Sequence, residues 1–176
     1  MMPPTLRRNL TRAELHALVT DLAARPEEWR HRVAHDPTAR TYEQLNRDEH
    51  VAVWLICWMD DHDTGFHDHD VSCGALAVAD GEVVEERLAV GGPPLRRRVR
   101  AGGVIDFAAS DIHRIAHAGD HPAVTIHAYS PPLWRMGAYE TLPSGELQRH
   151  SISYAEELRP LGGGSSLPGL ALASDG

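Results

Sequence analysis

The N-terminal part of the chain has the hydrophobic spacing of an amphipathic helix. Its apolar side chains recur at intervals of three or four residues: Leu15, Leu18, Val19 and Leu22. Thr11 and Glu14 precede them with the three-residue spacing of a capping box, in which each residue satisfies a backbone amide of the other. The pattern predicts a helix over about residues 12–24. Pro26 predicts a second short helix, because proline fits the first helical turn.

From residue 51 the pattern is typical of β-strands. Residues 51–59 form a continuous apolar run of β-forming residues, which indicates a buried strand. Asp80 and Gly81 form a dipeptide typical of a hairpin turn. Seven further short runs are predicted to be strands: 73–78, 83–90, 95–99, 104–107, 113–116, 123–129 and 147–152. So many short strands, separated by turn residues, predict a mainly β fold, either a sandwich or a barrel.

Composition narrows the classes of function. A chain of 176 residues suits one domain. Its net charge of −8 argues against a nucleic-acid partner, because backbone binding needs a clustered basic patch. The one basic run, 96–100, is expected to be a solvated strand face. With two cysteines, no apolar leader and no apolar stretch of about 18 residues, we expect a cytoplasmic protein without a membrane partner.

Three histidines have a spacing that suits a metal site. On a strand, His67 and His69 point to the same face, close enough to share one ion. His113 follows about 45 residues later and can arrive from a neighbouring strand. Imidazole suits Fe, Zn, Cu and Ni, and three protein ligands leave open positions, as catalytic metals require. A lone His-x-His pair usually binds nothing, so the argument depends on its surroundings.

Those surroundings resemble the two cupin motifs. His67, His69 and Gly81 match the histidines and the last glycine of the first motif, and His113 matches the histidine of the second. Gly74 stands where most cupins have a glutamate ligand. The segment from residue 125 to 132 reads Thr-Ile-His-Ala-Tyr-Ser-Pro-Pro and is similar to the Ser-x-His-x-Tyr-Ser-Pro-Pro signature of cysteine dioxygenases. Over about residues 40–142 the chain therefore resembles the cysteine dioxygenase family of cupins.

The resemblance implies a fold and an activity. It implies a single jelly-roll-like cupin β-barrel over 41–160. We expect the helical segment over 1–40 to pack on this barrel, and the tail over 161–176, which is rich in Gly, Ser and Ala, to be flexible. His67, His69 and His113 would hold iron(II). O₂ would be the co-substrate, and both its atoms would pass to the sulfur of a small thiol to give a sulfinate. We expect a monomer or small homo-oligomer.

A second group of residues is expected to assist this chemistry. Thr125, His127 and Tyr129 alternate along one strand and so share a face, although alternating residues can also be plain core. On the catalytic reading, the threonine hydroxyl orients the imidazole, and the imidazole orients the phenol toward the metal-bound ligands. Some family members cross-link this tyrosine to a cysteine. The equivalent residue here is Gly74, and Cys73 should face the other way, so no cross-link is expected.

The substrate is left open by the sequence. Cysteine dioxygenases have a carboxylate-binding arginine shortly after a tyrosine. Here Tyr42 is followed by Glu43 and Gln44, so Gln44 is the candidate at that place. Three arginines can supply the missing charge: Arg40, Arg47 and Arg135. Trp134 beside Arg135 is a candidate pocket residue. Cysteine, a 3-mercaptopropionate-like thiol acid and a larger thiol such as a thioimidazole all remain candidates.

Two other classes of function stay open at this point. One is a cupin enzyme with another metal and reaction, and the missing glutamate and the Tyr129 segment count against it. The other is a non-catalytic ligand-binding cupin. Such proteins often lose their metal histidines, whereas this chain retains all three.

Overall fold

The N-terminal segment folds as one helix followed by two short turns. The computed structural model describes residues 8–153. Helix α1 spans Arg12–Ala23 and begins with the predicted capping box. A second short helix begins at Pro26 as predicted, but it is a 3₁₀ helix of three residues, Pro26–Glu28, and a further 3₁₀ helix follows at Arg30–Arg32. Trp29, between them, is buried and its indole Nε1 donates to the carbonyl of Leu22 at 3.2 Å. The indole of Trp29 therefore packs against the end of α1, and the chain on either side of it forms 3₁₀ turns instead of one continuous α-helix.

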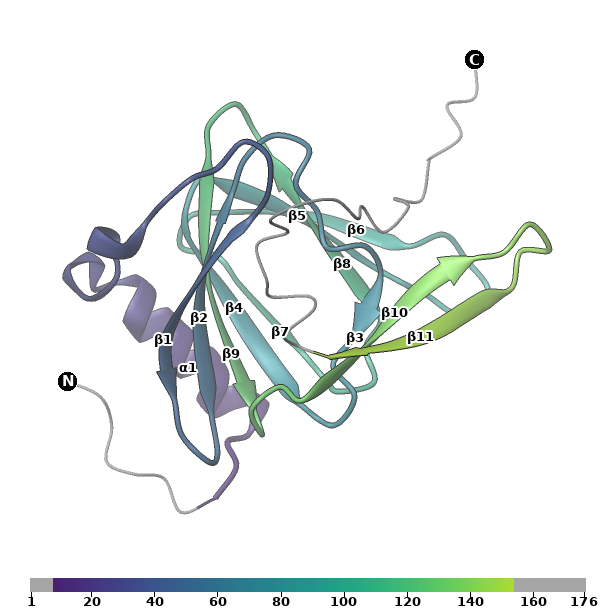
Figure 1. The fold of residues 1–176 in the computed structure, drawn as a ribbon, viewed down its shortest axis with the longest axis horizontal. Helices are drawn as coiled ribbons and strands as arrows, with labels where there is room; N and C mark the ends of the chain where they lie inside the picture. Colours follow the sequence, from purple (N-terminus) through teal and green to yellow (C-terminus); the bar gives the residue numbers. More distant parts are fainter. Residues whose placement is uncertain (1–7, 154–176) are drawn as a thin grey trace.

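The rest of the described chain is a two-sheet antiparallel fold (Figure 1). One sheet has five strands in the order β1-β2-β9-β4-β7, and the other has six in the order β11-β10-β3-β8-β5-β6. The predicted mainly β fold is confirmed, but the sheets are not joined into one closed barrel. The strands are β1 (Thr41–Arg47), β2 (Ala52–Trp58), β3 (His67–Asp68), β4 (Cys73–Asp80), β5 (Glu82–Arg87), β6 (Leu95–Arg100), β7 (Val104–Phe107), β8 (His113–Ala118), β9 (Ala123–Ser130), β10 (Arg135–Thr141) and β11 (Leu147–Ser153).

The sequence pattern missed three strands of this fold: β1, the two-residue β3 and β10. β1 is polar because it forms the edge of its sheet, where one or both faces meet water. β10 is likewise polar at its C-terminal end, and β5 ends at Arg87 instead of residue 90.

The predicted tail over 161–176 lies outside the described residues. Within residues 8–153, no helix has the length and apolar character needed to cross a membrane.

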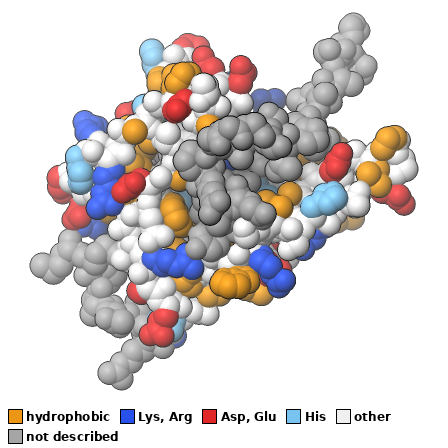
Figure 2. All heavy atoms as spheres, in the orientation of Figure 1, with side chains coloured by type: hydrophobic (Ala, Val, Ile, Leu, Met, Phe, Trp, Pro, Cys, Tyr) orange, Lys and Arg blue, Asp and Glu red, His pale blue; other side chains and the backbone are white. Residues whose placement is uncertain are grey.

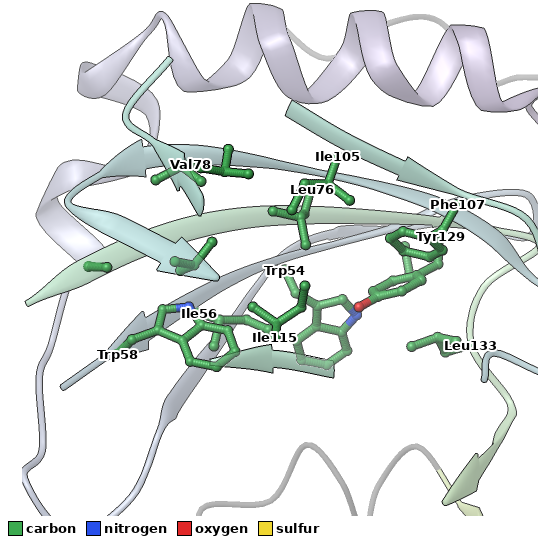
Figure 3. Packing of buried hydrophobic residues seen from close by; sticks show 14 of the residues in the cluster. Trp54, Ile56, Trp58, Leu76, Val78, Ile105, Phe107, Ile115, Tyr129 and Leu133 are labelled. Carbon is green, nitrogen blue, oxygen red and sulfur yellow. The ribbon is translucent and has the colours of Figure 1, made fainter. Parts of the chain in front are cut away.

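The central strands of the five-stranded sheet, β2, β9 and β4, are buried on both faces along most of their length. On β9, Val124, Ile126 and Ala128 pack with the apolar face of α1, whereas the alternate residues face the other sheet. β2 divides in the same way, which explains why its sequence is a continuous apolar run. The packing between the sheets includes Trp54, Trp58, Phe107 and Tyr129 (Figure 3). The functional site lies in this inner layer.

The outer surface carries interspersed charges of both signs (Figure 2). The basic run on β6 is paired with acids on the neighbouring strand β5. Arg98 and Arg100 each lie 2.7 Å from Glu82, and Arg97 lies 2.8 Å from Glu85. These arginines therefore have carboxylate partners within the sheet, as cross-strand pairing of opposite charges would favour.

One polar anchor fixes the short strand β3 to the β10–β11 hairpin. Asp68 lies between His67 and His69 in the sequence and is buried. Its side chain points to the opposite face of the strand from theirs. Its carboxylate accepts two hydrogen bonds from the Arg149 guanidinium, at 2.7 and 2.9 Å, and one from the Tyr139 hydroxyl at 2.6 Å. Burial opposes ionisation, but these bonds prevail and hold the pKa of Asp68 below its usual value. A strand of two residues needs such an anchor, because its own ladder is short.

We expect Arg149→Ala to destabilise the protein by about 1–3 kcal/mol, because it removes charge-assisted hydrogen bonds from a buried carboxylate. The loss is measured as the change in free energy of unfolding in urea. His150→Ala, on the neighbouring residue of β11, is the control and should change this free energy by less than about 0.5 kcal/mol. Equal losses in the two variants would contradict the anchoring role of Asp68.

Candidate metal centre

Three histidines from two strands and a loop converge between the sheets. His67 on β3 and His113 on β8 are direct cross-strand partners, and His69 follows β3 by one residue. One ring nitrogen from each lies within 4.8 Å of the others. All three are buried, with exposed fractions of 5%, 1% and 1% for His67, His69 and His113. The predicted convergence of these side chains is thus present in the fold.

The hydrogen bonds of these rings leave nitrogen atoms available to a metal. Nδ1 of His67 lies 3.0 Å from the carbonyl oxygen of Gly65, and Nδ1 of His113 lies 3.0 Å from Glu85 Oε1. Nε2 of His113 and both ring nitrogens of His69 are buried without a hydrogen-bond partner in the described structure. Unpaired buried nitrogens are costly, and a shared metal ion would satisfy them.

The electrostatics favour neutral rings. Burial, and then the neighbouring imidazoles, hold the pKa values of His67 and His69 well below the usual range. Neutral imidazole is the form that ligates metals, so at neutral pH these side chains need not lose a proton first. The donor set fits a metal such as iron, zinc, copper or nickel.

A chain of hydrogen bonds runs along β9 beside the histidines. The indole Nε1 of Trp58 donates to the Thr125 hydroxyl oxygen at 2.8 Å. This oxygen lies 2.8 Å from Nε2 of His127, and Nδ1 of His127 lies 3.0 Å from the Tyr129 hydroxyl. Burial lowers the pKa of His127 to about 3, so this ring is neutral. The Tyr129 ring lies 5.3 Å from the His69 ring between centroids.

One pocket between the sheets is lined by the three histidines of the cluster together with His127 and Tyr129. Of the predicted substrate residues, Tyr42 lines the pocket, whereas Gln44 is exposed and is not part of the lining. Trp134 and Arg135 are also exposed and lie outside it, with Arg135 3.5 Å from Asp70. The lining is Arg40, Tyr42, Ile56, Thr64, His67, His69, Leu76, Phe107, His113, Ile115, His127, Tyr129, Leu133 and Met136.

Arg40 is the cation of this lining. Its guanidinium carbon lies 5.4 Å from the ring centroids of both Tyr42 and Trp58. Two aromatic faces therefore hold the side chain beside the pocket by cation–π contact. The sequence offers Arg40, Arg47 and Arg135 as equal candidates for the missing positive charge. It does not single out Arg40, because this residue precedes β1 and no strand pattern shows where its side chain points.

Sequence comparison assigns the family. The profile described as cysteine dioxygenase type I matches residues 5–142. The chain belongs to this family. The predicted resemblance is thereby confirmed, and family membership together with the three-histidine cluster supports a metal-binding oxidoreductase of the dioxygenase type. No curated protein matches the chain significantly.

Solved structures agree on the fold. A Thermus thermophilus protein, TT1209, is 17% identical, with a TM-score of 0.51 over 58% of this chain and 93% of its own. An uncharacterised Klebsiella pneumoniae protein with a double-stranded β-helix domain is 14% identical, with a TM-score of 0.50 over 74% and 90%. BH2720 of Bacillus halodurans is 18% identical, with a TM-score of 0.51 over 74% and 84%. These likenesses show the double-stranded β-helix, or cupin, fold alone.

Gly74 distinguishes this member of the cysteine dioxygenase family from cupins with a fourth ligand. A Cβ atom at residue 74 would lie 2.3 Å from Cε2 of Phe107, far inside contact distance. The Phe107 ring in turn stacks on His69, with centroids 4.4 Å apart, and lies beside Tyr129 (Figure 3). Phe107 thus fills the place that a longer side chain at residue 74 would need. Cys73 packs on the α1 side of the sheet, away from Tyr129.

We expect Gly74→Ala to destabilise the protein by about 1–3 kcal/mol, because the new methyl group must displace the Phe107 ring. Thermal unfolding measures the loss. The double variant Gly74→Ala/Phe107→Leu should regain part of it, since leucine lacks the ring atoms that clash.

Gly92→Ala is the matched control, because a Cβ atom there meets nothing within 4 Å. If Gly74→Ala were as stable as Gly92→Ala, Phe107 would not be packed against residue 74.

Proposed function

We propose that this protein is an iron(II)-dependent thiol dioxygenase that converts a small thiol, R–SH, and O₂ into the sulfinic acid R–SO₂H. The observation that carries the proposal is the cluster of three buried histidines in one pocket with Tyr129 and Arg40. Membership of the cysteine dioxygenase family supports the same reaction. His67, His69 and His113 would hold the ion. Bound iron(II) would supply the redox chemistry that lets O₂ react with a thiolate.

The relay on β9 holds a proton at the Tyr129 hydroxyl. An indole N–H can only donate, so Trp58 occupies a lone pair of the Thr125 oxygen. A hydroxyl that accepts can also donate, and we propose that the Thr125 hydrogen is donated to Nε2 of His127 and that the Nδ1 hydrogen of His127 is donated to the Tyr129 oxygen. In this direction Tyr129 accepts one bond and can donate its own hydrogen toward a substrate. Thr125 and His127 are positioning residues that orient Tyr129.

Arg40 gives the substrate class. A guanidinium matches a carboxylate in shape and charge, and Arg40 is the one arginine in the pocket lining, which contains no lysine. We propose that the substrate is a thiol acid such as cysteine or 3-mercaptopropionate, with its carboxylate at Arg40 and its sulfur at the histidines. In the family the carboxylate-binding arginine comes shortly after a tyrosine, whereas Arg40 precedes Tyr42. The Tyr42 ring contacts the Arg40 guanidinium and so supports it.

Iron-loaded protein should consume O₂ when a thiol acid is added, and the product should be a sulfinate. Run under ¹⁸O₂, mass spectrometry should find two labelled oxygen atoms in each product molecule. Disulfide as the only product, or a sulfinate with a single label, would refute the dioxygenase. Binding of iron without any thiol-dependent O₂ uptake would instead favour the ligand-binding cupin.

Arg40→Gln should raise KM for cysteine or 3-mercaptopropionate by about tenfold or more, because a charge-assisted contact to the carboxylate is lost. The same variant should leave KM for cysteamine, which has no carboxylate, within about twofold of its starting value. An oxygen electrode gives both constants.

Arg135→Gln is the matched control, since Arg135 is exposed and outside the pocket lining. If Arg40→Gln weakened cysteamine and the thiol acids equally, Arg40 would not be the carboxylate contact.

A further inference from the structure

A cluster of charged side chains lies behind His113, on the inner face of the six-stranded sheet. Alternation along β5 points Val83, Glu85 and Arg87 toward the space between the sheets, and Val83 packs there with Ile115. Glu85 is only 3% exposed. A buried carboxylate costs several kcal/mol unless it is paired, so its presence in a mostly apolar layer calls for specific partners.

Glu85 has three such partners. Its Oε1 atom accepts from Arg87 at 2.8 Å and lies 3.0 Å from Nδ1 of His113, and its Oε2 atom accepts from Arg97 at 2.8 Å. Arg87 also donates to Asp111 at 3.0 Å, which fixes the guanidinium from its other side. Two arginines thus hold the Glu85 carboxylate in one orientation against the imidazole.

This contact fixes the tautomer of His113. An ionised carboxylate can only accept, so Nδ1 of His113 must carry a hydrogen and donate it. Nε2 is then the nitrogen that is left for a metal, and it is buried without a hydrogen-bond partner in the described structure. The carboxylate therefore leaves the lone pair of His113 on the side of His67 and His69.

The three histidines differ in this support. The partner of His67 is the neutral carbonyl of Gly65. For His69, the described residues provide no hydrogen-bond partner to either ring nitrogen. Among residues 8–153, a carboxylate contacts only His113 of the three. A carboxylate at Nδ1 raises the basicity of Nε2, so His113 should donate more electron density than the other two.

We propose that Glu85 is a positioning residue that makes His113 the most basic of the three histidines, and so raises metal affinity and lowers the Fe(III)/Fe(II) potential. The proposal rests on the metal site of the proposed function but not on the reaction with thiols. The Glu85 carboxylate acts through His113 and touches neither metal nor substrate.

The test compares iron(II) binding and midpoint potential in the full chain with Glu85→Gln and Glu86→Gln. Glutamine at residue 85 keeps one acceptor oxygen, removes the charge and replaces the other oxygen with an NH₂ donor of nearly the same size. We expect anaerobic titration with Fe(II) to give about 10- to 100-fold weaker binding for Glu85→Gln, and the potential to shift to a more positive value. A loss of packing alone would not shift the potential in this direction.

Glu86→Gln is the matched control. Glu86 is the next residue on the same strand, points to the opposite face, and pairs with Arg96 and Arg114 at 3.7 and 3.5 Å. Its substitution should leave affinity and potential within error of the starting protein. A Glu85→Gln variant that matches Glu86→Gln in both measurements would overturn the proposal.

A second variant covers the case in which Glu85→Gln does not fold. Arg97 is half exposed and contacts the far carboxylate oxygen, so Arg97→Gln loosens Glu85 without touching His113. It should weaken Fe(II) binding by a smaller factor in the same direction, and unchanged binding and potential would count against the role of Glu85. Wild-type protein that binds Fe(II) but oxidises no thiol would refute the proposed function, while a Glu85-dependent affinity would still support this inference.

Discussion

Desolvation of three imidazoles at one point is the constraint around which this structure is arranged. Burial keeps His67 and His69 neutral and leaves ring nitrogens without hydrogen-bond partners. Such atoms are destabilising in a packed layer unless a ligand satisfies them. The protein therefore gives up stability at this place, and packing elsewhere must offset the loss. The strands β2 and β9, which are buried along their whole length, supply that packing.

The elements that carry the histidines are short and depend on contacts outside themselves. β3 has two residues, and Asp68 anchors it to the β10–β11 hairpin through Arg149 and Tyr139. His69, beyond the strand end, rests on the Phe107 ring, which needs Gly74 opposite it. The site is thus positioned by side-chain contacts from both sheets, because no single strand could hold all three rings.

Charge is distributed unequally around the pocket. Arg40 brings a cation to the end where Tyr42 and Trp58 lie, whereas Glu85 places an anion behind His113, held by two arginines of its own. Arg40 would attract a negatively charged substrate, and Glu85 would stabilise a metal cation at the histidines. The two features suit the two partners that the proposed function requires.

The sequence by itself determined the mainly β fold, the capped helix, most strands and the grouping of His67, His69 and His113. These features follow from local periodicity and from motif spacing, both of which a chain displays before it folds. The polar edge strand β1 and the two-residue β3 could not be predicted from the sequence, because they form only by pairing with other strands of the sheet. The same holds for Arg40, Glu85 and Phe107. Their roles come from which side chains the two sheets bring face to face, and only the tertiary structure decides that.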